Sequence, residues 1–401
     1  MLFEEARRRR RRRRLAGGLA GLLAAGGAVV AVVVGAPGPR PAPGSVATGR
    51  NPIAAAHKAM GRLPTVRVAW VDYSGQLHVG DLATRAQHVV ARVGASPADP
   101  MIHIGGGLYW SDDGGVNPAS QAFVEELNLA TGRIRHVARG ESVFPSVNGR
   151  HLYIPQAETR LVERPVTGDG PARRLTLPPG WSLPSGLGGW AVAGGIVVYS
   201  GGAGGGYGAS LGIWNPRTGQ VQVIGTGDIF DASTPPGAGY SLLAWKPDSC
   251  AARLRCPIVI TNTSTHVRVI VRSPLRYGFT YGGAFARGAF SPEGAHLAVF
   301  VNVANPFDGS SGPGLSELAI ASTTTGHLRV VPAARFVTTE DSGWARWLPT
   351  GRQLLAGAAE GSYAVNAATL AARPFSFFTL PGQAPGGQDI NWSATLIATR
   401  H

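Results

Sequence analysis

The sequence predicts an all-β fold made of repeated antiparallel units, and three observations support this prediction. One phrase recurs along the chain: an apolar strand runs into a Thr-Gly-type turn, and a second β-rich strand follows. A second phrase recurs beside it, an aromatic residue followed by a tight Pro-containing turn. The 57 glycines and 30 prolines fall between the apolar runs, which is the placement of turns rather than of disorder.

The first phrase has three clear copies and three weaker ones. The clear copies are Val124–Val137, Leu211–Ile224 and Leu315–Val331, and the weaker ones are Leu77–Val90, Ile258–Val271 and Ser362–Phe375. Their spacing of roughly 45–50 residues is close to the length of a β-propeller blade. A blade has four antiparallel strands, a to d from the centre outwards, and we expect the phrase to form strands c and d.

The second phrase marks the tight turns between strands a and b. It occurs as Trp245-Lys246-Pro247-Asp248-Ser249, Phe290-Ser291-Pro292-Glu293-Gly294 and Trp347-Leu348-Pro349-Thr350-Gly351, with a looser copy at Pro145–Gly149. With these turns the chain resembles the TolB-like and WD-repeat-like propellers, whose blades carry an FSPDG-type hairpin. The resemblance covers roughly residues 65–401. It implies the fold and no particular function, because propellers host enzymes, ligand binders and scaffolds alike.

The repeats predict a seven-bladed β-propeller. Six blades are expected at residues 101–140, 142–181, 189–227, 240–273, 288–332 and 345–380. The seventh would combine outer strands from Val66–Val93 with inner strands from Asp389–Arg400, so that both chain-end edges are protected. Six or eight blades are also compatible with the sequence, because Val66–Val71 and Thr395–Thr399 could compete for one strand position.

Repeated aromatic residues are expected to pack blade against blade. We place Trp245, Phe290, Trp347 and Trp392 on strand a, and Trp110, Tyr199 and Phe300 at the end of strand b.

The N-terminal residues predict a membrane anchor. Residues 1–14 form a short stub with an arginine run from Arg7 to Arg14, and residues 15–36 carry no charge over a length that spans a bilayer. Because positive charge stays in the cytoplasm, the Pro/Gly-rich linker at 37–64 and the propeller at 65–401 should lie outside the membrane. The alternative is a cleaved signal peptide and a secreted protein.

The arginine run supplies more than half of the net charge of +14, so the folded part is only mildly basic. It contains no basic stripe with interleaved aromatics, and nucleic acid is therefore not an expected partner. We expect instead an envelope protein, a peptide or a glycan, together with the membrane.

Cys250 and Cys256 are the two cysteines, and an exported chain favours a disulfide between them. The histidines, among them His78, His136, His266 and His327, are expected to face solvent on strands. No spacing typical of a metal site, a nucleotide loop or a catalytic motif occurs, so neither a metal nor a cofactor is expected.

Long, irregular segments are expected in the b–c and d–a connections, which emerge on one face of a propeller, here named the loop face. They are 111–121, 200–210, 228–239, 302–316 and 338–343. Variable loops on a rigid scaffold usually carry binding. The candidate ligand-binding residues of this face are Asp112, Asp113, Glu141, Trp190, Tyr207, Asp231, Tyr240, Arg287, Glu340, Asp341, Trp344 and Asp389.

The sequence favours a non-enzymatic binding, sensor or scaffold module at the cell envelope. The alternative is a propeller hydrolase, lyase or glycosidase that uses carboxylates at the channel mouth. Asp341 and Asp389 would be the pair to consider, because carboxylates held about 5–10 Å apart can do acid–base work.

Overall fold

The structure is a computed structural model that describes residues 63–72, 74–93, 101–112, 122–140, 142–167, 170–184, 189–200, 209–248, 256–272, 289–302, 314–338, 344–358, 361–375 and 395–397. The chain divides into two compact units, residues 1–54 and 55–401, and all the described residues belong to the second. The predicted stub, anchor and most of the linker lie outside them. Within the described ranges, no helix is long and apolar enough to cross a membrane.

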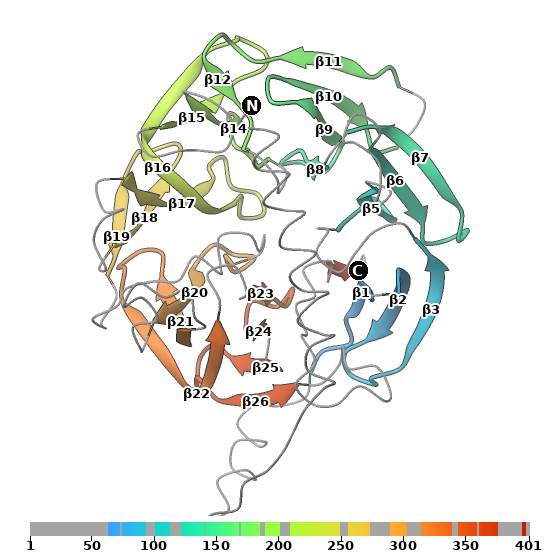
Figure 1. Cartoon of the computed structure of the whole chain (residues 1–401). Coiled ribbons are helices and arrows are strands. Elements are labelled where there is room, and N and C mark those ends of the chain that lie inside the picture. The colour runs from blue at the N-terminus through green and yellow to red at the C-terminus, as the bar shows by residue number, and fades with distance from the viewer. Residues whose placement is uncertain are drawn as a thin grey trace, which may run out of the picture. The chain divides into compact units, whose positions relative to one another are not determined.

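The described elements are all strands, and they pair in antiparallel ladders (Figure 1). Ladder 1 consists of β27 (Thr395–Ile397), β1 (Arg67–Val71), β2 (Gln76–Asp81) and β3 (Gln87–Arg92). Ladder 2 consists of β4 (Ile102–Ile104), β5 (Gly107–Asp112), β6 (Phe123–Asn128) and β7 (Ile134–Arg139). Ladder 3 consists of β8 (Phe144–Pro145), β9 (His151–Ala157), β10 (Arg160–Pro165) and β11 (Arg173–Thr176).

The remaining strands continue the same pattern. Ladder 4 consists of β12 (Trp181–Ser182), β13 (Ala191–Val192), β14 (Gly195–Ser200), β15 (Ser210–Trp214) and the first part of β16 (Val221–Ser233). Ladder 5 consists of the second part of β16, β17 (Leu242–Pro247), β18 (Ile258–Asn262) and β19 (Arg268–Val271). Ladder 6 consists of β20 (His296–Asn302), β21 (Gly314–Ser322) and β22 (Leu328–Thr338). Ladder 7 consists of β23 (Trp344–Trp347), β24 (Gln353–Ala358), β25 (Gly361–Asn366) and β26 (Ala372–Phe375).

The c–d turn is the most regular local structure, and it explains the repeated phrase. In ladder 2 the Asn128 side chain accepts hydrogen bonds from the backbone N–H groups of Ala130 and Thr131, and Gly132 follows at a φ of 69°. Asp81, Asn215, Asn262 and Asn366 make the same two bonds in their turns. An Asx side chain therefore starts the turn, and a left-handed residue ends it.

The chain ends close ladder 1 as the sequence predicts. β27 pairs antiparallel with β1, in the register Arg67 to Ile397 and Ala69 to Thr395. The two segments thus occupy neighbouring positions and do not compete for one strand position. Seven ladders occur within the described residues; the blade number of the whole chain stays a prediction.

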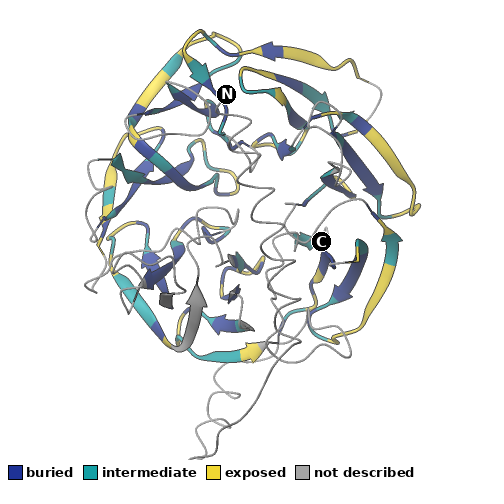
Figure 2. Cartoon of the chain, in the orientation of Figure 1, coloured by how far each residue is buried: buried dark blue, intermediate teal, exposed yellow. Residues whose placement is uncertain are grey.

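Hydrophobic clusters join each ladder to the next. For example, Leu77 of ladder 1 packs in one cluster with Trp110 of ladder 2, and Phe300 of ladder 6 packs in another with Trp347 of ladder 7. A further cluster contains Leu355 of ladder 7 and Trp70 of ladder 1, so the succession returns to its start. Figure 2 shows buried strand residues inside the ladders and exposed ones along the outer strands. The core is therefore divided among the spaces between blades.

The predicted blade at 240–273 needs a correction at its inner edge. β16 pairs with β15 up to Thr226 and with β17 from Gly227 onwards, so residues 228–233 are a strand and not a loop. Trp245, on β17, therefore belongs to strand b, as Trp110 and Tyr199 do, and not to strand a. Gly227, at a φ of 149°, lets the strand pass between blades, because a Cβ there would lie 2.0 Å from the Lys246 carbonyl oxygen.

The other predicted packing aromatics are where the sequence places them. Phe290, Trp347, Trp110, Tyr199 and Phe300 are all buried. Trp392 lies outside the described residues.

Candidate functional site

The ends of strands b mark the loop face. Strand b ends at Asp112, Ser200 and Asn302 in ladders 2, 4 and 6, and strand c begins at Phe123, Ser210 and Gly314. The bounds of these three b–c connections therefore lie within three residues of those predicted from the sequence. By contrast, the c–d connections of ladders 1, 2, 4, 5 and 7 are tight Asx turns. The opposite face, which carries the a–b and c–d connections, is named the turn face below.

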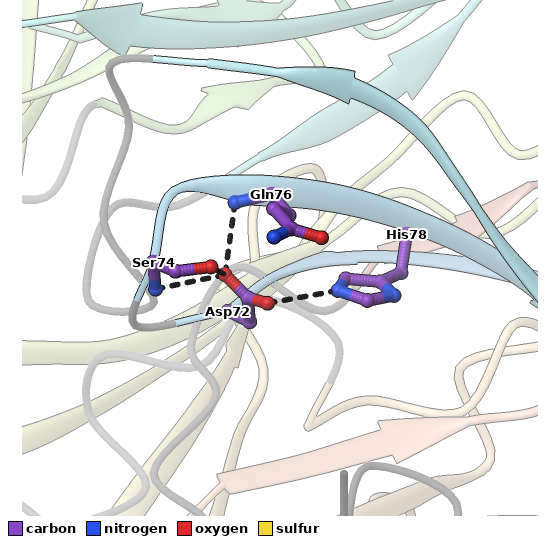
Figure 3. Close-up of polar contacts among 4 residues, drawn as sticks. All are labelled: Asp72, Ser74, Gln76 and His78. Carbon is purple, nitrogen blue, oxygen red and sulfur yellow. Dashed lines mark hydrogen bonds and ion pairs between the residues drawn. The ribbon is translucent and has the colours of Figure 1, made fainter.

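The best-defined polar group on the loop face surrounds Asp72, at the b–c turn of ladder 1 (Figure 3). Oδ1 of Asp72 accepts hydrogen bonds of 2.8 Å each from the Ser74 backbone N–H, the Ser74 hydroxyl and the Gln76 backbone N–H. Oδ2 lies 3.0 Å from Nε2 of His78 on β2. The His78 ring also stacks on Trp70, with ring centroids 5.2 Å apart.

These contacts decide the charge state of Asp72. Burial alone would raise the pKa of its carboxyl, but the hydrogen bonds from His78, Gln76 and Ser74 prevail and lower the pKa below its ordinary value. The Ser74 hydroxyl donates to the Asp72 carboxylate and not to the His78 imidazole. This arrangement differs from a catalytic Ser–His–Asp triad, in which the serine hydroxyl donates to the histidine. The group therefore acts as an anionic clamp that fixes the turn.

A second polar group lies on the innermost strands. Asp231, on β16, is 1% exposed, and its carboxylate accepts hydrogen bonds from the backbone N–H groups of Ala232 (2.8 Å) and Phe290 (3.2 Å). Arg346, on β23, contributes a positive charge that acts on it. Ladders 5, 6 and 7 thus supply the carboxylate, one backbone donor and a nearby positive charge, respectively.

Burial dominates the electrostatics of this pair. It raises the pKa of Asp231 to about 6, although the two backbone bonds, Arg346 and the Trp190 indole all lower it. The Trp190 Nε1–H lowers the pKa of Asp231 although it does not form a hydrogen bond of good geometry. Burial lowers the pKa of Arg346 to about 10, which leaves the guanidinium charged at neutral pH. Asp231 of ladder 5 and Arg346 of ladder 7 therefore influence each other electrostatically.

A third group joins ladders 4 and 5 at the loop face. The Tyr199 hydroxyl accepts a hydrogen bond of 2.7 Å from the Ile229 backbone N–H. Asp228 pairs in register with Lys246. Burial raises the pKa of Asp228 to about 6, the charge of Asp248 raises it further, and Lys246 lowers it. No set of three metal-ligating side chains that could hold an ion occurs within the described ranges.

Most of the predicted ligand-face residues cannot be placed. Asp113, Glu141, Tyr207, Arg287, Glu340, Asp341 and Asp389 lie outside the described residues. Asp112 ends β5 and Trp344 begins β23, both on the loop-face ends of their strands.

The structure places three of the predicted residues differently. Trp190 is buried in the cluster between ladders 4 and 5, and Asp231 is buried on strand a. Tyr240 follows strand a of ladder 5, so it lies in an a–b connection on the turn face. The corrections for Asp231 and Tyr240 share one cause, the extension of β16 beyond Gly227.

His78 and Cys256 also differ from simple surface residues. His78 is 5% exposed, against the expectation that it faces solvent, whereas His136, His266 and His327 are exposed as expected. Cys256 is buried, has no disulfide partner among the described residues, and places its Sγ 4.0 Å from the Pro247 carbonyl oxygen. Cys250 lies outside those residues, so the disulfide stays a prediction.

Comparison with solved structures finds propeller proteins at low identity. TolB from Acinetobacter baumannii is 13% identical with a TM-score of 0.38, and the match covers 66% of this chain and 62% of TolB, less than two thirds of its length. Oligogalacturonate lyase from Vibrio parahaemolyticus is 12% identical with a TM-score of 0.44, over 82% of this chain and 89% of the lyase. A functionally unknown protein from Desulfotomaculum acetoxidans is 9% identical with a TM-score of 0.47, over 83% and 99%.

The likeness to TolB-like propellers is one of fold. A scan against protein-family models and a search of curated proteins gave no match. The propeller fold follows from the ladders themselves, and the function has to be argued from this chain's own residues.

The sequence did not predict the Asp72–His78 contact or the role of Arg346. Asp72 and His78 stand six residues apart across a b–c hairpin, and the alternation of Trp70, Asp72 and His78 on adjoining strands was the available signal. Arg346 is the middle residue of the Ala345–Trp347 segment and gave no signal of its own, because its partner Asp231 lies more than a hundred residues away.

Proposed function

We propose that this protein is a membrane-anchored, extracytoplasmic β-propeller that acts as a non-enzymatic binding, sensor or scaffold module at the cell envelope. Its partner would be an envelope protein, a peptide or a glycan, and the loop face would receive it. The head would stand on the Pro-rich linker outside the anchor at residues 15–36.

One observation carries the proposal: the two faces differ in their connections. The turn face has c–d turns fixed by Asx hydrogen bonds in five ladders, whereas the loop face joins strands b and c of ladders 2, 4 and 6 by the longer segments after Asp112, Ser200 and Asn302. Long connections on a scaffold closed between its first and last strands can vary without cost to the fold. This is the usual arrangement of a recognition surface.

The described polar groups support a scaffold role. The carboxylate of Asp72 is engaged by four hydrogen bonds within its own hairpin. Asp231 is engaged by two backbone N–H groups and by the charge of Arg346. Both side chains are therefore held inside the frame that presents the loops, and the Asp72 carboxylate stabilises its own hairpin. The enzymatic alternative depends on Asp341 and Asp389, which lie outside the described residues.

Photo-crosslinking in intact cells tests the proposal. A photoreactive amino acid is placed in the full chain at Val116 or Ser310, within b–c connections. Matched control sites are Thr131 and Thr265, exposed residues of c–d turns. We expect discrete crosslinked products from the b–c sites and none of these from the c–d sites. Products of equal yield from all four sites, or from the c–d sites alone, would contradict a recognition role for the loop face.

A further inference from the structure

We propose that the turn face is a docking surface for the anionic phospholipid headgroups of the membrane that anchors the chain. This inference rests on the proposed anchor. It adds an orientation, in which the turn face looks toward the bilayer and the loop face looks away from it.

The first support is the place where the chain reaches the propeller. Leu63 and Val66 precede β1 and pack in one cluster with Leu82 and Leu348. Leu82 lies in the c–d turn of ladder 1, and its backbone N–H donates a hydrogen bond of 2.9 Å to the Val66 carbonyl oxygen. Leu348 begins the a–b turn of ladder 7. The chain therefore enters at the turn face, and residues 1–62, with the predicted anchor, precede this point.

The linker keeps the turn face within reach of the bilayer but does not hold it in contact with the headgroups. An extended Pro-rich chain spans about 3.1 Å per residue, so the linker from residue 37 to Leu63 can reach roughly 80 Å. Contact with the headgroups therefore needs an attraction of its own.

The second support is an excess of exposed positive charge on the turn face. Six exposed arginines occupy its c–d turns, its a–b turns and the beginning of β1: Arg67, Arg85, Arg133, Arg150, Arg217 and Arg352. The carboxylates in the same turns are fewer. Asp81 accepts the N–H groups of its own turn, Glu293 lies against Gly351, and Asp169 lies outside the described residues. Each arginine near an anionic bilayer favours the docked state by roughly fivefold.

An apolar contact lies beside this charge. Val147, at the tip of the a–b turn of ladder 3, is 45% exposed and lies three residues from Arg150. A basic surface with an exposed apolar side chain suits the headgroup region. The loop face differs, because the partly exposed carboxylates Glu158, Asp228 and Asp248 lie there beside its basic residues.

Energy transfer in vesicles tests the docking. The full-length chain is reconstituted in phosphatidylcholine vesicles, with or without about 30 mol% phosphatidylglycerol, that contain an acceptor-labelled lipid. A fluorescent amino acid is placed at Thr131 on the turn face or at Glu158 on the loop face. We expect transfer from Thr131 to rise with phosphatidylglycerol and to exceed transfer from Glu158. The rise should disappear in 1 M NaCl, where the screening length is about 3 Å.

Charge variants identify the surface. Replacing Arg85, Arg133 and Arg217 with Gln should shift the docking equilibrium by roughly 100-fold and abolish the rise. The matched control replaces Arg92, Arg139 and Arg160, which are exposed at the loop-face ends of their strands, and should keep the rise. Transfer that ignores phosphatidylglycerol, a closer Glu158 label, or equal losses in both triple variants would overturn the docking.

Flotation in 1 M NaCl separates the two proposals. A chain that floats with the vesicles but shows no lipid-dependent transfer refutes turn-face docking alone. A chain that no longer floats refutes the anchor in the proposed function, and the docking that rests on it.

Discussion

The Asp72 clamp can be tested by removing its carboxylate. In Asp72→Ala, the hydroxyl and backbone N–H of the exposed Ser74 can turn to water, whereas the donors from Gln76 and His78 lose their acceptor inside the hairpin. A hydrogen bond to a charged group is worth about 1.5–3 kcal/mol. Two such bonds that are not fully additive give an expected loss of about 3 kcal/mol in the free energy of unfolding.

The same carboxylate gives a pH signature with a definite sign. Its folded pKa is lowered from the ordinary 3.8, so its contribution to stability is fully present above about pH 4 and is lost as the pH falls through the folded pKa. Asp72→Asn keeps the shape of the side chain but does not titrate. We expect this variant to lose part of the acid-induced drop in stability that the wild type shows below pH 4.

Urea unfolding followed by tryptophan fluorescence measures both effects. The control is Asp81→Asn, because Asn128, Asn215, Asn262 and Asn366 already make the equivalent turn bonds in other ladders. That change should stay within about 0.5 kcal/mol. An Asp72→Ala loss below about 1 kcal/mol, or an acid response that is identical in Asp72→Asn and wild type, would refute the clamp.

Four further predictions concern the frame. Deleting residues 387–401 removes β27 from β1 and should broaden thermal unfolding, and a truncated chain that melts as sharply and as high as the full chain would contradict ring closure. His266 has a φ of 60°, so His266→Val should be about 1–2 kcal/mol less stable than His266→Gly in urea unfolding, and equal stabilities would argue against left-handed strain. Because the folded pKa of Asp231 is raised to about 6, the free energy of unfolding of the wild type should fall as the pH rises from 4 to 6. Asp231→Asn should reduce this pH dependence, and Asp228 should account for the part that remains. An unchanged pH dependence in Asp231→Asn would show that Asp231 does not contribute to it. Mass mapping without reduction should find Cys250 joined to Cys256, and two free thiols would refute the disulfide. Replacing both cysteines with Ser should lower the free energy of unfolding by at most about 2–3 kcal/mol.

Much of the fold is predictable because five ladders share one kind of c–d turn. The Asx residue, the threonine after it and the left-handed position fix the c–d turn by contacts within a few residues. The pairing of β27 with β1 follows from the need to cover two edges. Local chemistry and edge protection were therefore enough to predict most ladder boundaries.

Strand a of ladder 5 could not be predicted from local sequence patterns. The segment Gly225–Gly227 looks like a terminating turn, yet β16 continues through it because the glycines let the backbone pass close to Lys246 and Trp245. The sequence Trp245-Lys246-Pro247-Asp248 also imitates an a–b turn. Only the pairing of β17 with β16 on one side and β18 on the other shows that this segment ends strand b.

The candidate site was less predictable for a similar reason. Asp72 and His78 meet within one hairpin and could have been paired from their spacing. Arg346 influences the pKa of Asp231 only because ladders 5, 6 and 7 follow one another, and nothing in either local sequence carries that information. Electrostatic contacts between blades depend on the assembled ring.

Both proposals require that the propeller lies outside the membrane on an N-terminal anchor. Protease added to intact cells measures this most directly, with an antibody against the propeller and a tag on the N-terminal stub. The account predicts that the propeller is degraded, that the stub is protected, and that the mature chain still begins at the stub. A protected propeller, or a mature N-terminus near residue 37 or 48, would contradict it.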